Sequence, residues 1–393
     1  MWTKEFLSEE QLAFYKLHPW YYAEFEKFSI RTSNIIELYK SREGYRKFLP
    51  PYVGISLTYK CNLTCKMCFQ DDRSKYEHEM STDKLIEIAD EIKDWETFPW
   101  VTLWGGEPLL NKNFRTVYER FQEAAGVVTI LTNGVLLHHY LDLISDASYK
   151  TVWVFSIDGT EDIHDEIRGK KGSFKKTMNN LRNAVQLRNS LETQNVFGVQ
   201  ITVTRQNLDS IKVLCQELVE IGVDWVVLNN LWFLTETESD LYLNQLTQYD
   251  YLQLSEDISS KGFVLERDLL PDPHKVHKII EECKEMSKTG TLIWSMPNHD
   301  LDESVRHYNP TLRKGPNTMS CYKNLVKMDI DVDGSVVACK QFPDIIYGSV
   351  ESQSIKDIWL SNLRFKMQDQ IVESNGFSIC NMCPDKALSV KYQ

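Results

Sequence analysis

Strand-like and helix-like segments alternate along this chain from residue 52 to about residue 230. The strand-like segments are short and rich in β-branched and aromatic residues, and they predict strands at 52–57, 100–104, 127–131, 151–157, 196–204 and 224–229. Amphipathic segments lie between them, with expected helix N-caps at Ser81 or Thr82 and at Ser173. Strands joined by helical crossovers predict a parallel α/β array.

The candidate functional residues lie at one rim of this expected sheet. The strands are almost continuously apolar, which indicates a sheet covered on both faces or curved into a barrel. Cysteines follow the first strand, a Gly-Gly-Glu-Pro stretch the second, Thr-Asn-Gly the third and Asp-Gly the fourth. Because the carboxyl ends of parallel strands share one rim, we expect the functional site there.

The most distinctive of these segments is KCNLTCKMCF at 60–69, which holds Cys61, Cys65 and Cys68. Three thiolates on one loop suit an iron-sulfur cube with one iron left open to another ligand. A zinc site is the competing interpretation, and it would need a fourth ligand from elsewhere in the chain. The nine cysteines are an odd number, which favours metal or redox chemistry over a disulfide framework.

Features of the whole chain narrow its setting. The N-terminal stretch has no basic segment followed by an apolar run, and no apolar stretch approaches the roughly 18 residues of a membrane span. We therefore expect a cytoplasmic protein without membrane partners. The net charge of −12 disfavours nucleic-acid binding through phosphate neutralisation and weakly favours a neutral or cationic substrate.

The CxxxCxxC spacing followed by an aromatic residue, together with WGGEPLL, LTNG and SIDG after the next three strands, resembles the radical S-adenosylmethionine enzymes. The resemblance runs from residue 52 to about 230 and implies a partial (β/α)6 barrel. It implies that Cys61, Cys65 and Cys68 hold a catalytic 4Fe-4S cluster whose open iron binds S-adenosylmethionine. Reductive cleavage of that cofactor then yields a 5'-deoxyadenosyl radical that abstracts a hydrogen atom from substrate carbon.

The same resemblance assigns contacts with S-adenosylmethionine. It implies that Glu107 accepts from the ammonium group of the cofactor, whereas for Asp158 simple turn chemistry remains an equal alternative. Thr202 and Thr204 end the fifth strand at the same rim, and β-propensity explains them equally well. The expected cofactor-binding residues are Phe69, Gly105, Gly106, Glu107, Pro108, Asn133, Ser156 and Asp158.

A second group of cysteines lies near the C-terminus. Cys321 and Cys339 flank an alternating segment with an Asp-Gly turn, which predicts a β-hairpin, and Cys380 and Cys383 form a CxxC pair. Spacing alone leaves zinc or a four-iron cluster open. The hairpin resembles the start of the SPASM and twitch extensions, which implies one auxiliary 4Fe-4S cluster with four cysteine ligands and an electron-transfer role.

Two cysteines remain, Cys215 and Cys283. Helical spacing makes each of them a core residue in the simplest interpretation. The alternative is that one of them donates a hydrogen atom to a substrate radical, as a thiol does in radical epimerases of the family.

These features divide the chain into four expected parts. They are an N-terminal helical segment at 1–50 that covers the barrel, a radical S-adenosylmethionine core at 51–235, a bridging region at 236–315 and an auxiliary-cluster domain at 316–393. Within the bridge we expect a solvated helix or lid at 236–256 and a linking helix at 273–289 with Gly290 as its C-cap.

The resemblance implies an oxidoreductase that takes electrons from a flavodoxin-type or ferredoxin-type reductant. Post-translational modification of a ribosomal peptide, by crosslinking, oxidation or epimerisation, is the favoured reaction. Dehydrogenation or epimerisation of a sugar or aminocyclitol in antibiotic biosynthesis is the alternative. A non-catalytic iron-sulfur scaffold and a zinc-binding module are hypotheses from other classes, and S-adenosylmethionine turnover or metal analysis would distinguish them.

Overall fold

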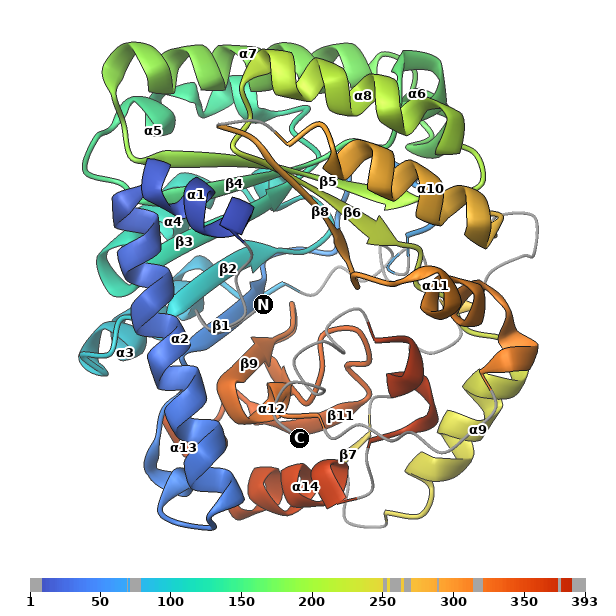
Figure 1. Cartoon of the computed structure of the whole chain (residues 1–393). Coiled ribbons are helices and arrows are strands. Elements are labelled where there is room, and N and C mark those ends of the chain that lie inside the picture. The colour runs from blue at the N-terminus through green and yellow to red at the C-terminus, as the bar shows by residue number, and fades with distance from the viewer. Residues whose placement is uncertain are drawn as a thin grey trace.

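One curved sheet organises the molecule (Figure 1). The structure is a computed structural model that describes residues 9–68, 70, 79–249, 253–254, 263–264, 270–287, 290–313, 321–373 and 376–383. In these residues the sheet has 11 strands in the order β7-β11-β10-β9-β1-β2-β3-β4-β5-β6-β8. No helix in the described part is both long enough and apolar enough to cross a lipid bilayer.

The six predicted strands form the middle of this sheet in chain order, and every neighbouring pair is parallel. They are β1 (Tyr52–Ser56), β2 (Trp100–Trp104), β3 (Val127–Thr132), β4 (Thr151–Ser156), β5 (Asn195–Val203) and β6 (Trp225–Asn230). The predicted α/β barrel architecture is thereby confirmed, with strand ends displaced by no more than one residue from those expected.

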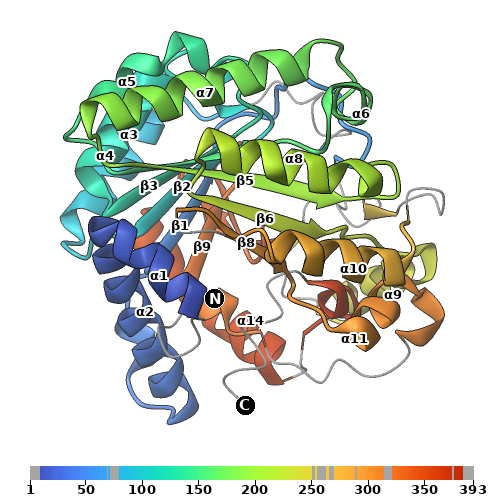
Figure 2. The same cartoon turned by 45° about the horizontal axis from the view of Figure 1, so that its top comes forward.

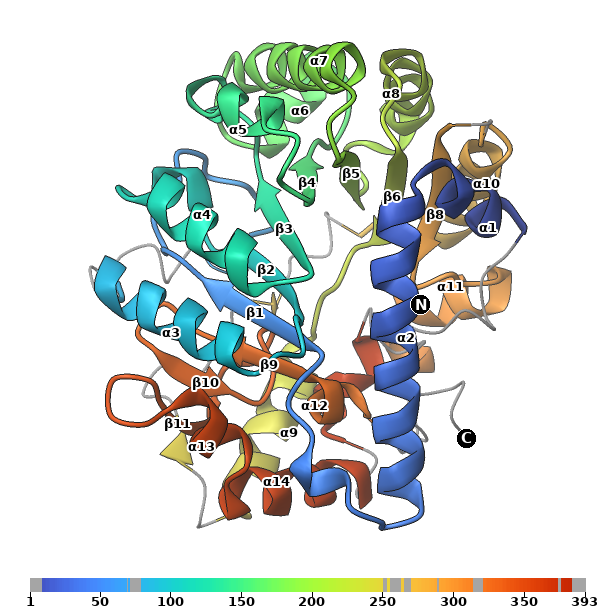
Figure 3. The same cartoon turned by 90° about the vertical axis from the view of Figure 1, so that its left-hand side faces the viewer.

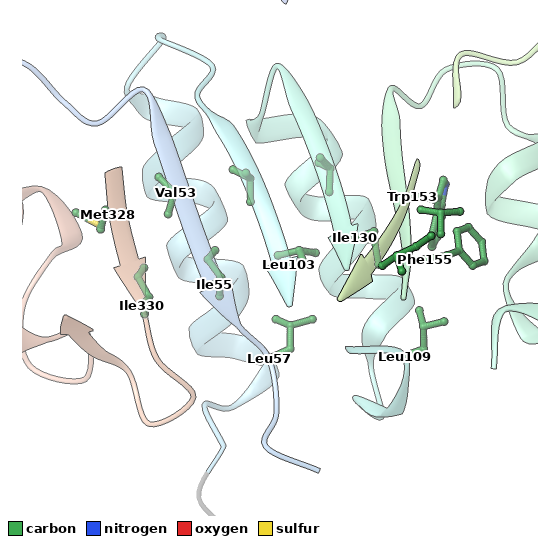
Figure 4. Close-up of a cluster of buried hydrophobic side chains, with 14 of the residues drawn as sticks. Val53, Ile55, Leu57, Leu103, Leu109, Ile130, Trp153, Phe155, Met328 and Ile330 are labelled. Carbon is green, nitrogen blue, oxygen red and sulfur yellow. The ribbon is translucent and has the colours of Figure 1, made fainter. Parts of the chain in front are cut away.

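Crossover helices cover the outer face of the curved sheet (Figures 2 and 3). They are α3 (Thr82–Asp94), α4 (Phe114–Ala124), α5 (Leu141–Ser145), α6 (Glu161–Ile167), α7 (Ser173–Leu191) and α8 (Leu208–Ile221). Their apolar side chains pack against strand residues such as Val53, Ile55, Leu103 and Ile130, each of which is fully buried (Figure 4). This interface is the main core of the protein.

Two helix starts test the expected caps. Ser81 does cap α3, because its Oγ accepts a hydrogen bond from the Lys84 backbone N–H at 3.1 Å. The cap predicted at Ser173 is wrong by one residue: Gly172, with φ 81°, occupies the N-cap position of α7. The Ser173 hydroxyl instead donates to Asp165 Oδ1 at 2.8 Å.

The parallel array extends beyond the predicted strands at both edges. β8 (Leu292–Met296) pairs in parallel with β6, and β9 (Lys327–Ile330) pairs in parallel with β1. The sequence analysis did not predict β8, because it is one short apolar run that the helix α10 (Pro273–Lys284) precedes by a few residues. β9 was predicted only as a hairpin strand.

The C-terminal part is joined to the barrel through β9. The predicted hairpin is confirmed, since β9 and β10 (Ser335–Val337) are antiparallel and Gly334, with φ 83°, lies in their turn. The antiparallel strands β11 (Ile345–Ser349) and β7 (Gln253–Leu254) follow outward. The helices of this part are α12 (Lys323–Val326), α13 (Ile355–Trp359), α14 (Asn362–Glu373) and a 3-10 helix at Ser378–Met382.

The N-terminal helices α1 (Glu9–Leu17) and α2 (Pro19–Lys40) fill one end of the barrel interior (Figure 3). Their aromatic residues, including Tyr15, Tyr21 and Phe25, pack in one cluster with Val152 and Val227 near the amino ends of the strands. The helical cover expected from the N-terminal aromatic residues is confirmed. Strand residues alternate between the two faces of the sheet. The inward-facing residues at the carboxyl ends of these strands point toward a separate cavity.

The bridging region differs from its prediction. The expected solvated helix or lid includes α9 (Glu236–Leu246), where Tyr242 and Leu246 are buried and Tyr242 donates to Asp344 Oδ2 at 2.9 Å. This contact joins α9 to the C-terminal part, whereas Glu236, Asp240 and Asn244 are exposed, as expected of a solvated helix. The linking helix α10 exists, but it ends at Lys284 with Glu285 as C-cap, and Gly290 instead precedes β8. The helix α11 (Leu301–Tyr308) follows β8.

Candidate functional site

A cavity of about 420 Å³ opens at the carboxyl ends of the strands. Both the cysteine loop and the start of the C-terminal part contribute to its wall. The described lining residues that the sequence analysis named are Cys61, Cys65, Cys68, Gly105, Gly106, Asn133, Ser156 and Thr202. The structure therefore brings most of the expected site residues together at the predicted rim.

The loop that carries the three thiols is held against the C-terminal end of α6. Thr64 N donates to Arg168 O at 3.1 Å, and Lys66 N donates to Ile167 O at 3.0 Å. Desolvation raises the pKa of Cys61 to about 11, so deprotonation of this thiol needs a metal or cation nearby. Three thiols facing one cavity fit the catalytic 4Fe-4S cluster.

Gly105 and Gly106 lie directly against the backbone before the first cysteine. Gly106 N donates to Thr58 O at 2.7 Å. A Cβ atom on Gly105 would stand 2.3 Å from Thr58 O, and one on Gly106 would stand 2.4 Å from Lys60 O. Glycine is needed at both positions because the backbone at 105–106 packs directly on the backbone at 58–60, with no room for a Cβ atom. This packing determines where the cysteine loop begins.

Glu107 does not line the cavity. Its side chain is fully buried, and Oε1 accepts from Thr132 Oγ1 at 2.7 Å and from Leu109 N at 3.1 Å, while Oε2 accepts from Asn133 N at 2.7 Å. Burial raises its pKa to about 7, against these hydrogen bonds. Glu107 therefore joins the loops after β2 and β3, and the expected contact with the ammonium of the cofactor is absent from this geometry. Pro108 begins the 3-10 turn Pro108–Leu110 and is also buried.

Asn133 and Ser156 present polar atoms to the cavity. Asn133 Nδ2 donates to Asn62 Oδ1 at 2.7 Å and lies 4.0 Å from Cys61 Sγ. Ser156 Oγ accepts from Gln200 Nε2 at 3.0 Å. These contacts orient groups that suit the polar parts of S-adenosylmethionine. Phe69, the expected adenine neighbour, lies outside the described residues.

Asp158 is placed differently from its predicted role. It is fully buried, and its Oδ2 forms an ion pair with Arg168 Nη2 at 2.5 Å, while Oδ1 accepts from Thr202 N at 2.7 Å. Arg168 in turn lies 3.6 Å, through Nη1, from Cys65 Sγ. Asp158 thus positions a cation beside the thiols, and it is not among the residues that line the cavity.

Neighbouring His164 supports this arrangement. Its Nδ1 accepts a hydrogen bond from Asp158 N at 3.2 Å, which requires an unprotonated nitrogen. Burial, with the nearby Arg168 charge, lowers the pKa of His164 to about 3. The imidazole is therefore neutral at physiological pH, and Asp158 is the carboxylate that compensates the arginine.

We predict that Asp158→Ala lowers the free energy of unfolding of the cluster-free protein by about 3–5 kcal/mol, because it leaves the Arg168 guanidinium buried without its carboxylate. Urea denaturation followed by circular dichroism measures this loss. The double variant Asp158→Ala/Arg168→Met should recover part of the stability. An equal or larger loss in the double variant would contradict the ion-pair explanation.

Several cavity residues were not predicted. They are Trp104, Arg168, Gln200, Asn229, Trp232, Lys340 and Gln341. Trp104 directly precedes the glycine motif, so its position at a strand end could have predicted its place in the cavity. No local sequence pattern predicts that Arg168 and Lys340 line the cavity. In the described lining the charged side chains, Arg168 and Lys340, are both basic. These charges do not favour the cationic form of the neutral or cationic substrate expected from net charge, because net charge reflects the whole surface.

The C-terminal cysteines approach one another in the second part of the protein. Cys321, Cys339 and Cys380 interact electrostatically, and Cys383 N donates to Cys380 O at 3.1 Å. Desolvation raises the pKa of Cys321 and of Cys380. No three His, Cys, Asp or Glu side chains of the described ranges converge on one metal ion. Four thiolates are a ligand set that suits either zinc or a four-iron cluster, so the geometry alone leaves both open.

Cys215 and Cys283 lie elsewhere. Both are fully buried, on α8 and α10, and their side chains are hydrogen-bonded to each other. Neither belongs to the cavity lining. The structure thus supports the interpretation as core residues and gives no access from either thiol to a substrate radical.

Family models agree with this geometry. The model of the Radical SAM superfamily matches residues 55–218, and the SPASM model, an iron-sulfur cluster-binding domain, matches residues 321–384. S-adenosylmethionine and 4Fe-4S clusters are accordingly the cofactors of the chain.

Similar proteins come from several functional settings. The sporulation killing factor maturation protein SkfB of Bacillus subtilis is 27% identical over 177 residues, which are 44% of this chain and only 41% of that relative. The tungsten-containing aldehyde ferredoxin oxidoreductase cofactor-modifying protein of Pyrococcus furiosus is 23% identical over 340 residues, 84% of this chain and 86% of the relative.

Among solved structures, Streptococcus suis SuiB bound to the precursor peptide SuiA superposes with a TM-score of 0.59 at 14% identity, over 91% of this chain and 74% of that chain. This similarity supports the fold. Together, the two family models and the thiols facing the cavity show that the chain carries a radical SAM domain at residues 55–218, followed by a SPASM domain at residues 321–384.

Proposed function

We propose that this protein is a radical SAM oxidoreductase that modifies a ribosomally made peptide. One observation carries the proposal: a single cavity is bounded by the cysteine loop at 61–68 and by Lys340 and Gln341, which directly follow Cys339. A substrate in this cavity lies between a catalytic cluster on Cys61, Cys65 and Cys68 and one auxiliary cluster on the C-terminal cysteines.

This placement assigns a role in the reaction to each group of residues. Reductive cleavage of bound S-adenosylmethionine supplies a 5'-deoxyadenosyl radical that removes a hydrogen atom from substrate carbon. Asn133, Ser156 and Arg168 bind and orient polar groups of the cofactor at the rim. The substrate then gives up one electron and one proton in an oxidation or crosslink. Cys321, Cys339, Cys380 and Cys383 would hold the electron acceptor, which leaves no auxiliary iron for the substrate.

The polar atoms of the cavity wall support a peptide. Trp104, Asn229 and Trp232 line the cavity, and their buried atoms Trp104 Nε1, Asn229 Oδ1 and Trp232 Nε1 have no hydrogen-bond partner in the described part of the protein. Buried polar atoms are normally paired, so these groups suit a ligand that offers both donors and acceptors. A peptide backbone offers both. The name of SkfB, a maturation protein, points in the same direction.

A small organic molecule is the second candidate. The relative that aligns over 86% of its own length is named a cofactor-modifying protein, and the basic side chains Arg168 and Lys340 at the cavity suit an anionic small molecule. Dehydrogenation or epimerisation of a sugar or aminocyclitol belongs to this class. A flavodoxin-type or ferredoxin-type reductant and a cytoplasmic location remain predictions.

A deuterium-transfer experiment separates the candidates. The reconstituted, reduced enzyme would be incubated with S-adenosylmethionine and with extract of cells grown in D2O, divided by size into peptide and small-molecule fractions. We expect deuterium in 5'-deoxyadenosine with the peptide fraction only, because the abstracted atom comes from substrate carbon. Deuterium with the small-molecule fraction alone would replace the peptide proposal with the second candidate. No 5'-deoxyadenosine under any condition would favour a non-catalytic scaffold.

A further inference from the structure

A buried lysine stands beside the C-terminal cysteines. Lys323 lies in α12, two residues after Cys321, and is only 4% exposed. Its Nζ donates to Gln341 Oε1 at 3.2 Å. A buried ammonium is costly unless it stabilises negative charge nearby, so its position at this site calls for an explanation.

Gln341 connects this lysine to a cluster ligand. Cys339 Sγ donates to the same Gln341 Oε1 at 3.1 Å, so the ammonium and the sulfur both lie within hydrogen-bonding distance of one oxygen atom. Lys323 therefore shares a hydrogen-bond acceptor with Cys339 Sγ, and it is two residues from Cys321 along the chain.

Binding of a cluster changes the role of Gln341. A thiolate bound to iron has no proton to donate, so Cys339 Sγ can no longer donate to Oε1 and becomes an acceptor. Lys323 holds Oε1, which leaves the amide NH2 of Gln341 available to the thiolate. Hydrogen bonds to cluster sulfurs and nearby positive charge both stabilise the reduced cluster, because reduction adds an electron in surroundings of low dielectric constant.

Other charged groups also face the cysteines. Asp344 is fully buried and accepts from Tyr242, whose hydroxyl interacts electrostatically with Cys339 and Cys380. This carboxylate opposes reduction of a neighbouring cluster. Lys340 is adjacent to Cys339 in sequence, but its ammonium lies over the Trp104 ring in the cavity, 4.9 Å from the ring centre. Lys323 is thus a buried cation hydrogen-bonded to Gln341 beside Cys339, and its charge is opposite to that of Asp344.

We propose that Lys323 and Gln341 raise the reduction potential of the auxiliary cluster and so enable it to accept the electron that leaves the substrate. This inference rests on the proposed function, since it takes the C-terminal cysteines as ligands of an electron-accepting cluster. Lys323 and Gln341 are positioning residues and touch no reacting atom. Gln341 also lines the cavity, so it lies between the substrate and the sulfur of Cys339.

The test is a redox titration of the anaerobically reconstituted full chain, monitored by electron paramagnetic resonance. We expect Lys323→Met to make reduction of the auxiliary cluster about tenfold less favourable, which for one electron is a fall of about 59 mV. Lys323→Arg, which keeps the charge, should restore most of the potential. The catalytic cluster, on a different loop, should keep its potential and serves as an internal reference.

Lys356→Met is the matched control. Lys356 is an exposed lysine of α13 in the same part of the protein, so its loss changes the net charge equally. Solvent screens this charge, and the potential should not move. An equal fall in Lys356→Met, or an unchanged potential in Lys323→Met with a full iron content, would overturn the inference.

A second variant covers the case in which Lys323→Met fails to bind its auxiliary cluster. Gln341→Met keeps the lysine and removes only the amide, and we expect its auxiliary cluster to have a lower potential than that of the wild type. An unchanged potential in Gln341→Met would overturn the inference. If the wild type itself binds only the catalytic cluster, the proposed function fails, and this result is distinct from a potential that does not respond to either variant.

Discussion

The triple variant Cys61→Ala/Cys65→Ala/Cys68→Ala should form no 5'-deoxyadenosine and should bind about four irons per chain, against about eight in the wild type. The three thiols face the cavity on one loop, and the four cysteines proposed to bind the auxiliary cluster lie in the C-terminal part. Removing the loop thiols therefore eliminates one cluster and leaves the other. Iron and sulfide analysis after anaerobic reconstitution measures the loss, and chromatography after dithionite reduction measures the nucleoside.

Cys215→Ala and Cys283→Ala are the controls for the triple variant. Both thiols are buried between α8 and α10, away from the cavity, so their loss should leave the iron content and cofactor cleavage unchanged. About four irons in the wild type, all lost in the triple variant, would mean that the C-terminal cysteines hold zinc or no metal. The electron-transfer part of the proposed function would then be wrong.

Gly105→Ala should reduce the rate of S-adenosylmethionine cleavage by about 100-fold, because displacement of a catalytic loop by about 1 Å costs that much. The new Cβ would stand 2.3 Å from Thr58 O, where backbone cannot yield without moving the cysteine loop, and the φ of 141° adds strain. The rate of 5'-deoxyadenosine formation at saturating reductant is the measurement.

Gly172→Ala is the matched control for backbone strain. Gly172 also has a positive φ, of 81°, but a Cβ there would meet no atom within 4 Å. This variant should lose some stability, on the order of 1 kcal/mol, and keep its cleavage rate. If both variants lose activity equally, general strain explains the effect, and contact between Gly105 and the cysteine loop does not.

The sequence predicted the barrel well because its signals are local. Each of the six central strands is an apolar run between helical segments, and period and length suffice to locate such strands. β8 was missed because a single short run has no periodicity to distinguish it. The packing of α9 was missed for another reason: Tyr242 and Asp344 are about a hundred positions apart, and no local pattern joins them.

The sequence predicted which residues lie at the site better than it predicted the partners that their side chains bind. Cysteine spacing predicted that Cys61, Cys65 and Cys68 lie at one cavity, because a loop of this length brings its own thiols together. Glu107 and Asp158 were both expected to contact the cofactor. Their carboxylate oxygens instead bind protein groups contributed by other strands and loops. Arg168 could not be predicted, since only folding brings its guanidinium to Cys65.

The parallel pairing of β9 with β1 has a mechanical consequence. The cysteine loop begins five residues after the end of β1, and the hairpin that starts at β9 leads to Cys339, so both ligand sets extend from neighbouring strands of one hydrogen-bonded sheet. Under the proposed function, the distance between the two clusters would therefore depend on the pairing of these two strands. The barrel and the C-terminal part should also unfold as one cooperative unit, because separating them would break the ladder between two buried strands.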